Sequence, residues 1–121
     1  MLFFLPESNE NLVCLKAIGK LTVEDYHSLV KAFPNILELH DTLRLYVDLQ
    51  DLEGWEWQIS WDVLKFSIKY WSKMEQIALI GTDRWAYLGE EALWKFTDAG
   101  VRFFGINEKE QALDWVTSIK T

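Results

Sequence analysis

Short apolar runs recur along the chain and alternate with longer stretches of helical spacing. Five of these runs predict strands, at residues 2–5, 12–18, 43–49, 76–81 and 101–106. The polar stretch 7–11 separates the first two, which indicates a turn and an antiparallel hairpin. Because the run 43–49 has almost no polar positions, we expect a strand that is buried on both faces. We expect Gly19 to end the second strand and Gly54 to mark the loop after the third.

Four stretches have the spacing of amphipathic helices, at residues 22–41, 59–72, 82–96 and 108–119. The Thr22 hydroxyl can cap the first of them, with the carboxylates of Glu24 and Asp25 facing the positive end of the helix. Pro34 removes the backbone hydrogen bond to Val30. The sequence therefore predicts a kink at this point, or a break followed by a new first turn.

Strands and helices alternate throughout, and the strands are too apolar for one face of the sheet to be exposed to solvent. This pattern favours a mostly parallel sheet with right-handed crossovers. The sequence has no internal repeat, no low-complexity tract and no linker. We predict one α/β domain over residues 1–121, with a mostly parallel mixed sheet of about five strands and about four main helices.

The predicted helix at 59–72 is apolar on two opposed faces. At about 100° per residue, the first face carries Ile59, Val63, Phe66 and Tyr70, and the second carries Trp61, Leu64, Ile68 and Trp71. Such a helix must be covered twice. We expect the first face to pack against the protein's own core and the second face to need another cover. A neighbouring helix, another chain or an apolar ligand could supply the second cover.

Seven tryptophans are many for this length, because a small domain has limited room to hide large indoles. We expect Trp55 and Trp57 in the loop after the third strand, and Tyr87 and Trp94 as an outward-facing pair on the predicted helix at 82–96. Two interpretations are open. Either the helices bury these rings against each other, or the rings line a groove for a lipid-like molecule, a partner helix or a membrane surface.

Lys65 flanks the second apolar face, together with Lys69 and Asp62. A cationic group beside an apolar strip suits an acyl carboxylate or a phospholipid head group, although a solvated helix edge is the ordinary reason for such residues. The candidate ligand-binding residues are Trp55, Trp57, Trp61, Leu64, Lys65, Ile68 and Trp71.

Nineteen acidic residues against twelve basic ones give a net charge of −7. This charge disfavours attraction to nucleic acid and to anionic head groups, so we expect no nucleic-acid partner. The amino-terminal segment is apolar for only five residues and is broken by Pro6. No apolar run approaches the roughly 18 residues of a membrane span. We expect a cytoplasmic protein, with peripheral membrane contact as the alternative.

Candidate catalytic groups are few. His27 and His40 lie in one predicted helix without metal-ligand spacing. Asp48, Asp51 and Glu53 cluster after the third strand, where α/β proteins usually place ligands. No glycine-rich phosphate cradle accompanies them, and loop solvation or helix-start charge also explains them. We predict a protein that is not an enzyme and that has no cofactor and no metal, with a small enzyme built on these carboxylates as the lowest-ranked alternative.

Cys14 is the single cysteine, which excludes an internal disulfide. It lies inside the apolar run LVCLKAI. We therefore interpret it as a small buried hydrophobic residue.

Three strings carry a family resemblance: GKLTVEDYHSLV at 19–30, LRLYVDLQDLEGW at 43–55 and WDVLKFSIKYWSKMEQIALIGTDRW at 61–85. The VRFF strand and the ALDW ending also fit. On these residues the chain resembles the SpoIIAA-like proteins, a bacterial group related in fold to the STAS domains of anti-sigma factor antagonists. The resemblance implies a STAS-like architecture with no established enzymatic activity. It further implies binding of a partner protein, a nucleotide or a small ligand, and for the SpoIIAA-like branch a hydrophobic ligand or a membrane.

One feature departs from the phosphorylation-switched STAS antagonists, which carry a serine in the loop after the strand corresponding to 43–49. That loop reads QDLEGWEWQIS here, with Glu53 and tryptophans where a kinase would need a hydroxyl. Ser60 is the nearest hydroxyl, and capping or packing explains it better. The leading hypothesis is a module that binds a lipid-like ligand or a membrane interface. The alternative is a protein-interaction module without a phosphoserine switch, including a homodimer closed through the same helix face.

Overall fold

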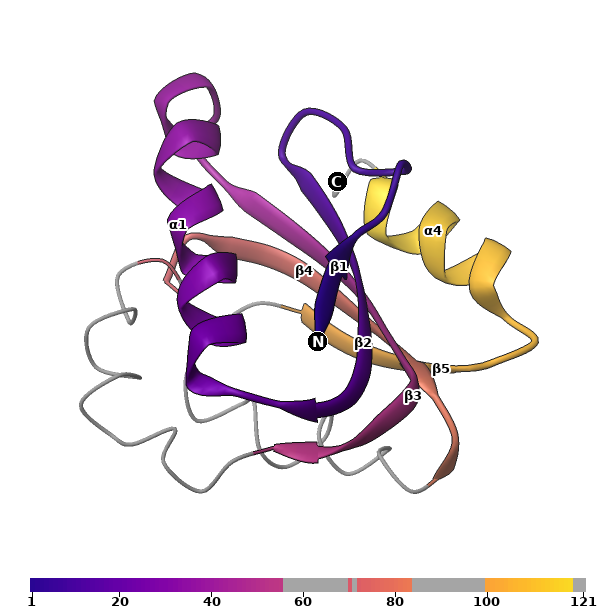
Figure 1. Ribbon diagram of the computed structural model, residues 1–121. Coiled ribbons are helices and arrows are strands. Elements are labelled where there is room, and N and C mark those ends of the chain that lie inside the picture. The colour runs from indigo at the N-terminus through magenta and orange to yellow at the C-terminus, as the bar shows by residue number, and fades with distance from the viewer. Residues whose placement is uncertain (56–69, 71, 84–99, 119–121) are drawn as a thin grey trace.

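The computed structural model describes residues 1–55, 70, 72–83 and 100–118 (Figure 1). The described elements are β1 (Leu2–Phe4), β2 (Leu12–Leu21), α1 (Val23–Leu39), β3 (Leu43–Trp55), β4 (Met74–Gly81), β5 (Gly100–Gly105) and α4 (Lys109–Thr117). This part of the chain contains two helices. The predicted helices at 59–72 and 82–96 fall almost entirely outside it.

The five strands form one mixed sheet in the order β1-β2-β3-β4-β5. β1 pairs with β2 in the antiparallel sense, and the other three pairings are parallel. The predicted hairpin is confirmed, because Leu2 pairs with Ala17 and Phe4 with Leu15. The turn between them includes an isolated bridge from Asn9 to Leu12.

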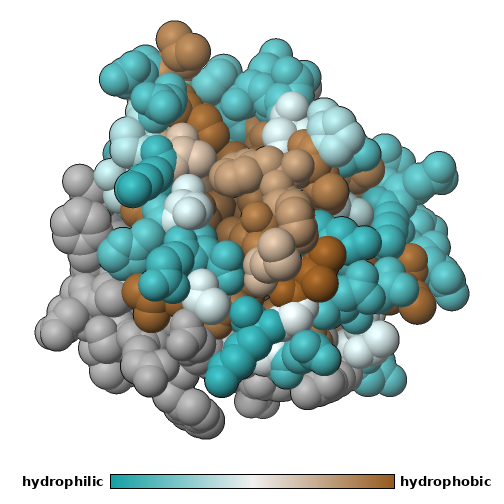
Figure 2. Space-filling model, in the orientation of Figure 1, coloured by the Kyte–Doolittle hydropathy of each residue, from teal (hydrophilic) through white to brown (hydrophobic). Residues whose placement is uncertain are grey.

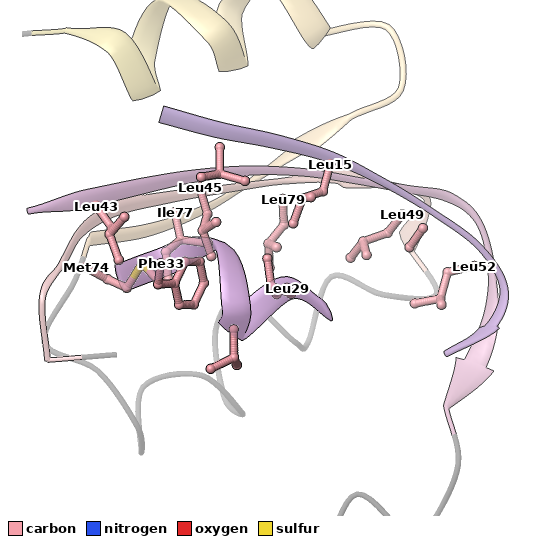
Figure 3. Packing of buried hydrophobic residues seen from close by; sticks show 13 residues of the cluster. Leu15, Leu29, Phe33, Leu43, Leu45, Leu49, Leu52, Met74, Ile77 and Leu79 are labelled. Atoms are coloured by element: carbon pink, nitrogen blue, oxygen red, sulfur yellow. The ribbon is translucent and has the colours of Figure 1, made fainter. Parts of the chain in front are cut away.

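The two described helices cover opposite faces of the sheet (Figure 1). On one face α1 buries Leu29, Val30 and Phe33 against leucine and isoleucine side chains of the strands. Figure 3 shows the Phe33 ring among Leu43, Leu45 and Ile77. On the other face α4 buries Ala112 and Val116 against a second cluster, which also holds Leu12, Cys14, Tyr46, Ala78, Ile80 and Phe104. Each fully buried large side chain stabilises the fold by about 1.5–3 kcal/mol.

The start of α1 follows the predicted capping pattern. The Thr22 hydroxyl accepts from the Asp25 N–H at 3.1 Å, and the Asp25 carboxylate accepts from the Thr22 N–H at 2.9 Å. The helix runs without a break through Pro34, so the predicted restart is wrong. Its end agrees with the prediction, since the His40 N–H donates to the Ile36 carbonyl. Within the described residues, no helix is long and apolar enough to cross a membrane.

Two predicted strand ends are wrong. β2 passes through Gly19 to Leu21, and β3 continues beyond Leu49 to Trp55. Trp55 therefore lies in a strand and not in the predicted loop. The physical reason is pairing between the two extensions, which satisfies their backbone groups and overrides the local turn signals of glycine and acidic residues.

A polar network ties the amino ends of β2, β3 and β4 to the end of α4. Asn11 Nδ2 donates to Thr42 Oγ1 at 3.2 Å, and Thr42 Oγ1 donates to Glu75 Oε2 at 2.9 Å. The Arg44 guanidinium pairs with Glu75 and donates to the Val116 carbonyl at 2.7 Å. A single arginine thus joins β4 to the last turn of a helix that is distant in sequence.

Candidate functional site

The carboxyl ends of the parallel strands are uneven in length. The pairing of β3 with β4 ends where Asp48 lies opposite Ile80. The pairing of β3 with β2 continues from Ile18 and Asp51 to Leu21 and Trp55. Residues 18–21 and 51–55 therefore form a two-stranded extension of the sheet, hereafter the ribbon.

The ribbon is irregular at its two glycines. The β2–β3 register shifts between Lys16 and Ile18 and again between Gly19 and Lys20. Gly19 has a φ of 68°, a left-handed conformation that costs glycine little and other residues more. Gly54 has a φ of 150°. These residues allow the ribbon to bend, so the glycines that predicted strand ends act here inside strands.

A shallow hollow of about 500 Å³ lies against the ribbon. Its lining residues are Ile18, Gly19, Gln50, Asp51, Leu52 and Glu53. Leu52 is buried, whereas the Ile18 side chain is partly exposed at 37%. The hollow therefore combines apolar and acidic surface, and the strand that lines one side of it ends at Trp55.

Asp48 is a buried carboxylate just before the ribbon, with 6% of its side chain exposed. Its Oδ2 lies 3.2 Å from the ammonium group of Lys109 at the start of α4. Its Oδ1 accepts from the Gln50 N–H at 2.9 Å, and the Gln50 side chain accepts from Lys109 at 3.3 Å. A buried carboxylate is costly unless it is paired and hydrogen-bonded, and both conditions hold here.

The second carboxylate of the predicted cluster is also paired. Asp51 Oδ2 lies 3.4 Å from Lys16 Nζ, across the β2–β3 boundary. Two of the three carboxylates, Asp48 and Asp51, are therefore engaged in ion pairs with lysines. Asp48, Asp51 and Glu53 all lie in β3 and not in a loop after it.

The two histidines lie at different positions on and beside α1. His27 is exposed on α1, and His40 caps the other end of that helix. The hollow beside the ribbon is lined by neither. Among the described residues, no group of three or more histidine, cysteine, aspartate or glutamate side chains is placed to hold a metal ion.

Cys14 is fully buried, as predicted. Burial, with a smaller contribution from the Glu7 carboxylate, raises the pKa of its thiol to about 11. Tyr46 lies opposite Cys14 on β3, and burial raises the pKa of its phenol to about 12, with Asp48 adding to the shift. Both groups are neutral at physiological pH, so neither supplies a nucleophile.

The structure places one member of the predicted ligand-binding set. The backbone of Trp55 pairs with Leu21 at the end of the ribbon. The other members, Trp57, Trp61, Leu64, Lys65, Ile68 and Trp71, lie outside the described residues. Tyr70, from the opposite face of the predicted helix, contacts Phe33 with ring centroids 5.7 Å apart. For this residue the predicted packing against the core is confirmed.

Two lysines were missed by the sequence analysis, Lys16 and Lys109. Lys16 could have been found because it is the one charged residue in the apolar run LVCLKAI. Its ammonium group needs either an acidic partner or exposure to solvent. Lys109 stands at the first position of α4, where the helix dipole disfavours a cation. A cation at this position is a sign that a carboxylate lies nearby.

Comparisons with known proteins match most of the chain. A family model described as SpoIIAA-like matches residues 12–117. The fold is similar to the crystal structure of an uncharacterized protein of the DUF3478 family with a SpoIIAA-like fold, from Shewanella loihica PV-4. That protein is 28% identical, the match covers 95% of this chain and 93% of that chain, and the TM-score is 0.72. No curated protein matches the sequence.

Proposed function

Because the chain belongs to the SpoIIAA-like family, we propose that it is a non-enzymatic binding module that takes up a lipid-like, apolar ligand. The binding residues are those of the tryptophan-rich segment 55–71, with Trp57 and Trp61 contacting the acyl chain. Lys65 pairs with the carboxylate or phosphate head of the ligand.

The ribbon is the observation that carries this proposal. It holds the backbone of Trp55 at the carboxyl edge of the sheet, beyond the last pairing of β3 with β4. Ligands of open α/β sheets usually bind outside the carboxyl ends of the strands. The partly exposed Ile18 adds apolar surface to the ribbon itself. Trp55, the first residue of the tryptophan-rich segment, therefore has its backbone at the edge where such ligands bind.

Charge narrows the class of ligand. The net charge of −7 opposes binding to a strongly anionic bilayer. Asp48 and Asp51 are each paired with a lysine, so their charges are already neutralised within the protein. A single fatty acid or the surface of a zwitterionic bilayer fits these conditions, and both present the same acyl chains.

Two binding assays on the purified protein distinguish binding of a free fatty acid from binding to a bilayer surface. Oleate below its micelle concentration is titrated in a calorimeter, and phosphatidylcholine vesicles are tested by co-sedimentation. We expect Trp57→Ala and Trp61→Ala each to weaken binding about tenfold, which corresponds to ~1.4 kcal/mol. Trp115→Phe is the control, because Trp115 packs against Phe104 beneath α4 and away from the ribbon. A wild-type protein that binds neither probe, or tryptophan variants that bind as the wild type does, would contradict the proposal.

The alternative function is a protein-interaction module. The observation in its favour is the exposed apolar surface at β1, which includes Phe3 and Phe4. This surface leads to a separate inference.

A further inference from the structure

β1 is an edge strand with unusually apolar exposed side chains. The exposed fraction is 43% for Phe3 and 51% for Phe4, and 63% for Met1 at the start of the strand. Ile18 of β2 is exposed by 37%, and its N–H donates to the Met1 carbonyl. Figure 2 shows apolar side chains gathered in the middle of this view, over β1. Natural edge strands usually carry charged side chains or proline, or are very short. β1 spans three residues and Pro6 follows it closely, but residues 1–5 have no charged side chain and no proline.

The hydrogen-bond pattern fixes which backbone groups of β1 face outward. The Met1 carbonyl accepts from Ile18, and the Leu5 N–H donates to the Cys14 carbonyl, so both residues face β2. In an antiparallel ladder alternate residues face the same neighbour, which adds Phe3 to this set. The N–H and C=O groups of Leu2 and Phe4 therefore point away from β2, along the open edge.

We propose that β1 is the interface of a homodimer in which two copies of this chain join their sheets edge to edge. The two β1 strands run antiparallel, related by a two-fold axis that is perpendicular to the sheet and passes between the two Phe3 residues. Leu2 of each copy exchanges both backbone hydrogen bonds with Phe4 of the other. The two Phe3 residues then form the central pair, in which no hydrogen bonds are exchanged and side chains approach closely.

Self-complementarity is the reason to assign a second copy as the partner. The outward-facing groups of Leu2 and Phe4 are arranged symmetrically about Phe3, so one register satisfies all of them. α4 contacts β3, β4 and β5, on the far side of β2 from this edge, whereas the first turn of α1 reaches the start of β1, where Asp25 Oδ2 lies 3.3 Å from the Met1 amino group. α1 contacts β3, and the two β3 strands would be about 24 Å apart at normal strand spacing, twice the diameter of a helix.

The area available matches a weak dimer. The side chains of Met1, Phe3 and Phe4 are about half exposed, and at roughly 200 Å² each they present on the order of 300 Å² per copy. Even with the strand backbone added, two copies together stay below the ~1,000 Å² at which specific, stable interfaces begin. We therefore expect dissociation in the micromolar range, with the charge of −7 on each copy making the dimer tighter at higher salt.

Sedimentation equilibrium of the full chain tests the interface. We expect a reversible monomer–dimer equilibrium for the wild type, weakened at least tenfold by Phe4→Lys. Phe4→Pro removes an outward N–H and leaves the bonds to β2 intact, so it should weaken the dimer without unfolding the monomer. The matched control is Leu39→Lys, because Leu39 is 82% exposed at the end of α1. A wild type that stays monomeric up to millimolar concentration overturns the proposal, as does a dimer that Leu39→Lys weakens as much as Phe4→Lys.

Disulfide cross-linking tests the register. The two Phe3 Cα atoms would lie about 4.5 Å apart, within the range that a disulfide can bridge. Oxidised Phe3→Cys should therefore form a covalent dimer, whereas Phe4→Cys should not, because each Phe4 lies opposite Leu2. The buried Cys14 does not compete. Equal cross-linking of both variants would overturn the register. Neither assay involves lipid, so this inference and the proposed function fail independently.

Discussion

Asp48 Oδ2 lies 3.2 Å from Lys109 Nζ, so the first residue of α4 neutralises a buried carboxylate of β3. The pair fixes α4 over the sheet at the end where the candidate site begins. It also explains why a lysine stands at a helix start, where the dipole alone would disfavour it. The attraction to Asp48 outweighs a dipole effect of about 0.3–1 kcal/mol.

Lys109→Met should destabilise the protein, because it leaves the Asp48 carboxylate buried without a cation. We expect a loss of about 1–2 kcal/mol, below the value for a fully buried pair because 41% of the Lys109 side chain is exposed. Guanidinium denaturation measures this loss. The double variant Asp48→Asn, Lys109→Met should recover part of it. Equal stability of Lys109→Met and the wild type would show that the pair has no structural role.

Asp25 gives the stability a defined dependence on pH. Burial alone would raise the pKa of this carboxyl, but hydrogen bonds from the backbone and side chain of Thr22 and the nearby amino terminus lower it below 3.8. The stabilisation is therefore present above the unfolded-state pKa and is lost as the pH falls through the folded-state pKa. Asp25→Asn should be less stable than the wild type at pH 7, and the difference should shrink below about pH 4.

Glu24→Gln is the control for this pH dependence, because Glu24 is exposed in the same helical turn and does not take part in the capping box. Unfolding is followed by circular dichroism from neutral pH to pH 2.5. A stability difference for Asp25→Asn that stays constant over this range would show that the carboxylate charge does not stabilise α1.

Arg44→Lys should destabilise the end of α4. The guanidinium donates to two backbone carbonyls, of Val116 at 2.7 Å and Ser118 at 2.6 Å, and also pairs with Glu75. A lysine cannot reproduce this planar set of donors, so we expect a loss of about 2 kcal/mol in chemical denaturation. Arg102→Lys is the comparison, since Arg102 is exposed and lies 4.9 Å from the Phe104 ring centroid. Equal losses for both variants would contradict the role of Arg44.

The strands and the capped helix could be predicted from the sequence because their signals are local. A continuous apolar run marks β2, and the Thr22–Asp25 spacing marks the start of α1. The ends of β2 and β3 could not be predicted in this way. Gly19 and Gly54 resemble strand terminators, and only the parallel pairing of Ile18–Leu21 with Asp51–Trp55 keeps them in the sheet. That pairing joins residues far apart in sequence.

The candidate site was likewise predictable only where its signals are local in sequence. Asp48 and Asp51 were recognised as a cluster because they stand close together in the sequence. Their partners, Lys109 and Lys16, come from other elements, so the change from a candidate acid–base site to ion pairs required the fold. The exposure of Phe3 and Phe4 at the sheet edge could not be predicted either. An apolar strand has the same sequence pattern whether it lies in the middle of a sheet or at its edge.

Fluorescence quenching by a fatty acid brominated along its acyl chain tests the central proposal most directly, because bromine quenches only indoles that it contacts. We predict saturable quenching in the wild type. The double variant that combines Trp57→Phe with Trp61→Phe should lose most of this quenching, and Trp115→Phe should quench as the wild type does. Phenylalanine keeps an aromatic ring at each position and so limits the effect on folding. Absence of saturable quenching in the wild type, or its full retention in the double variant, would contradict binding by the tryptophan-rich segment.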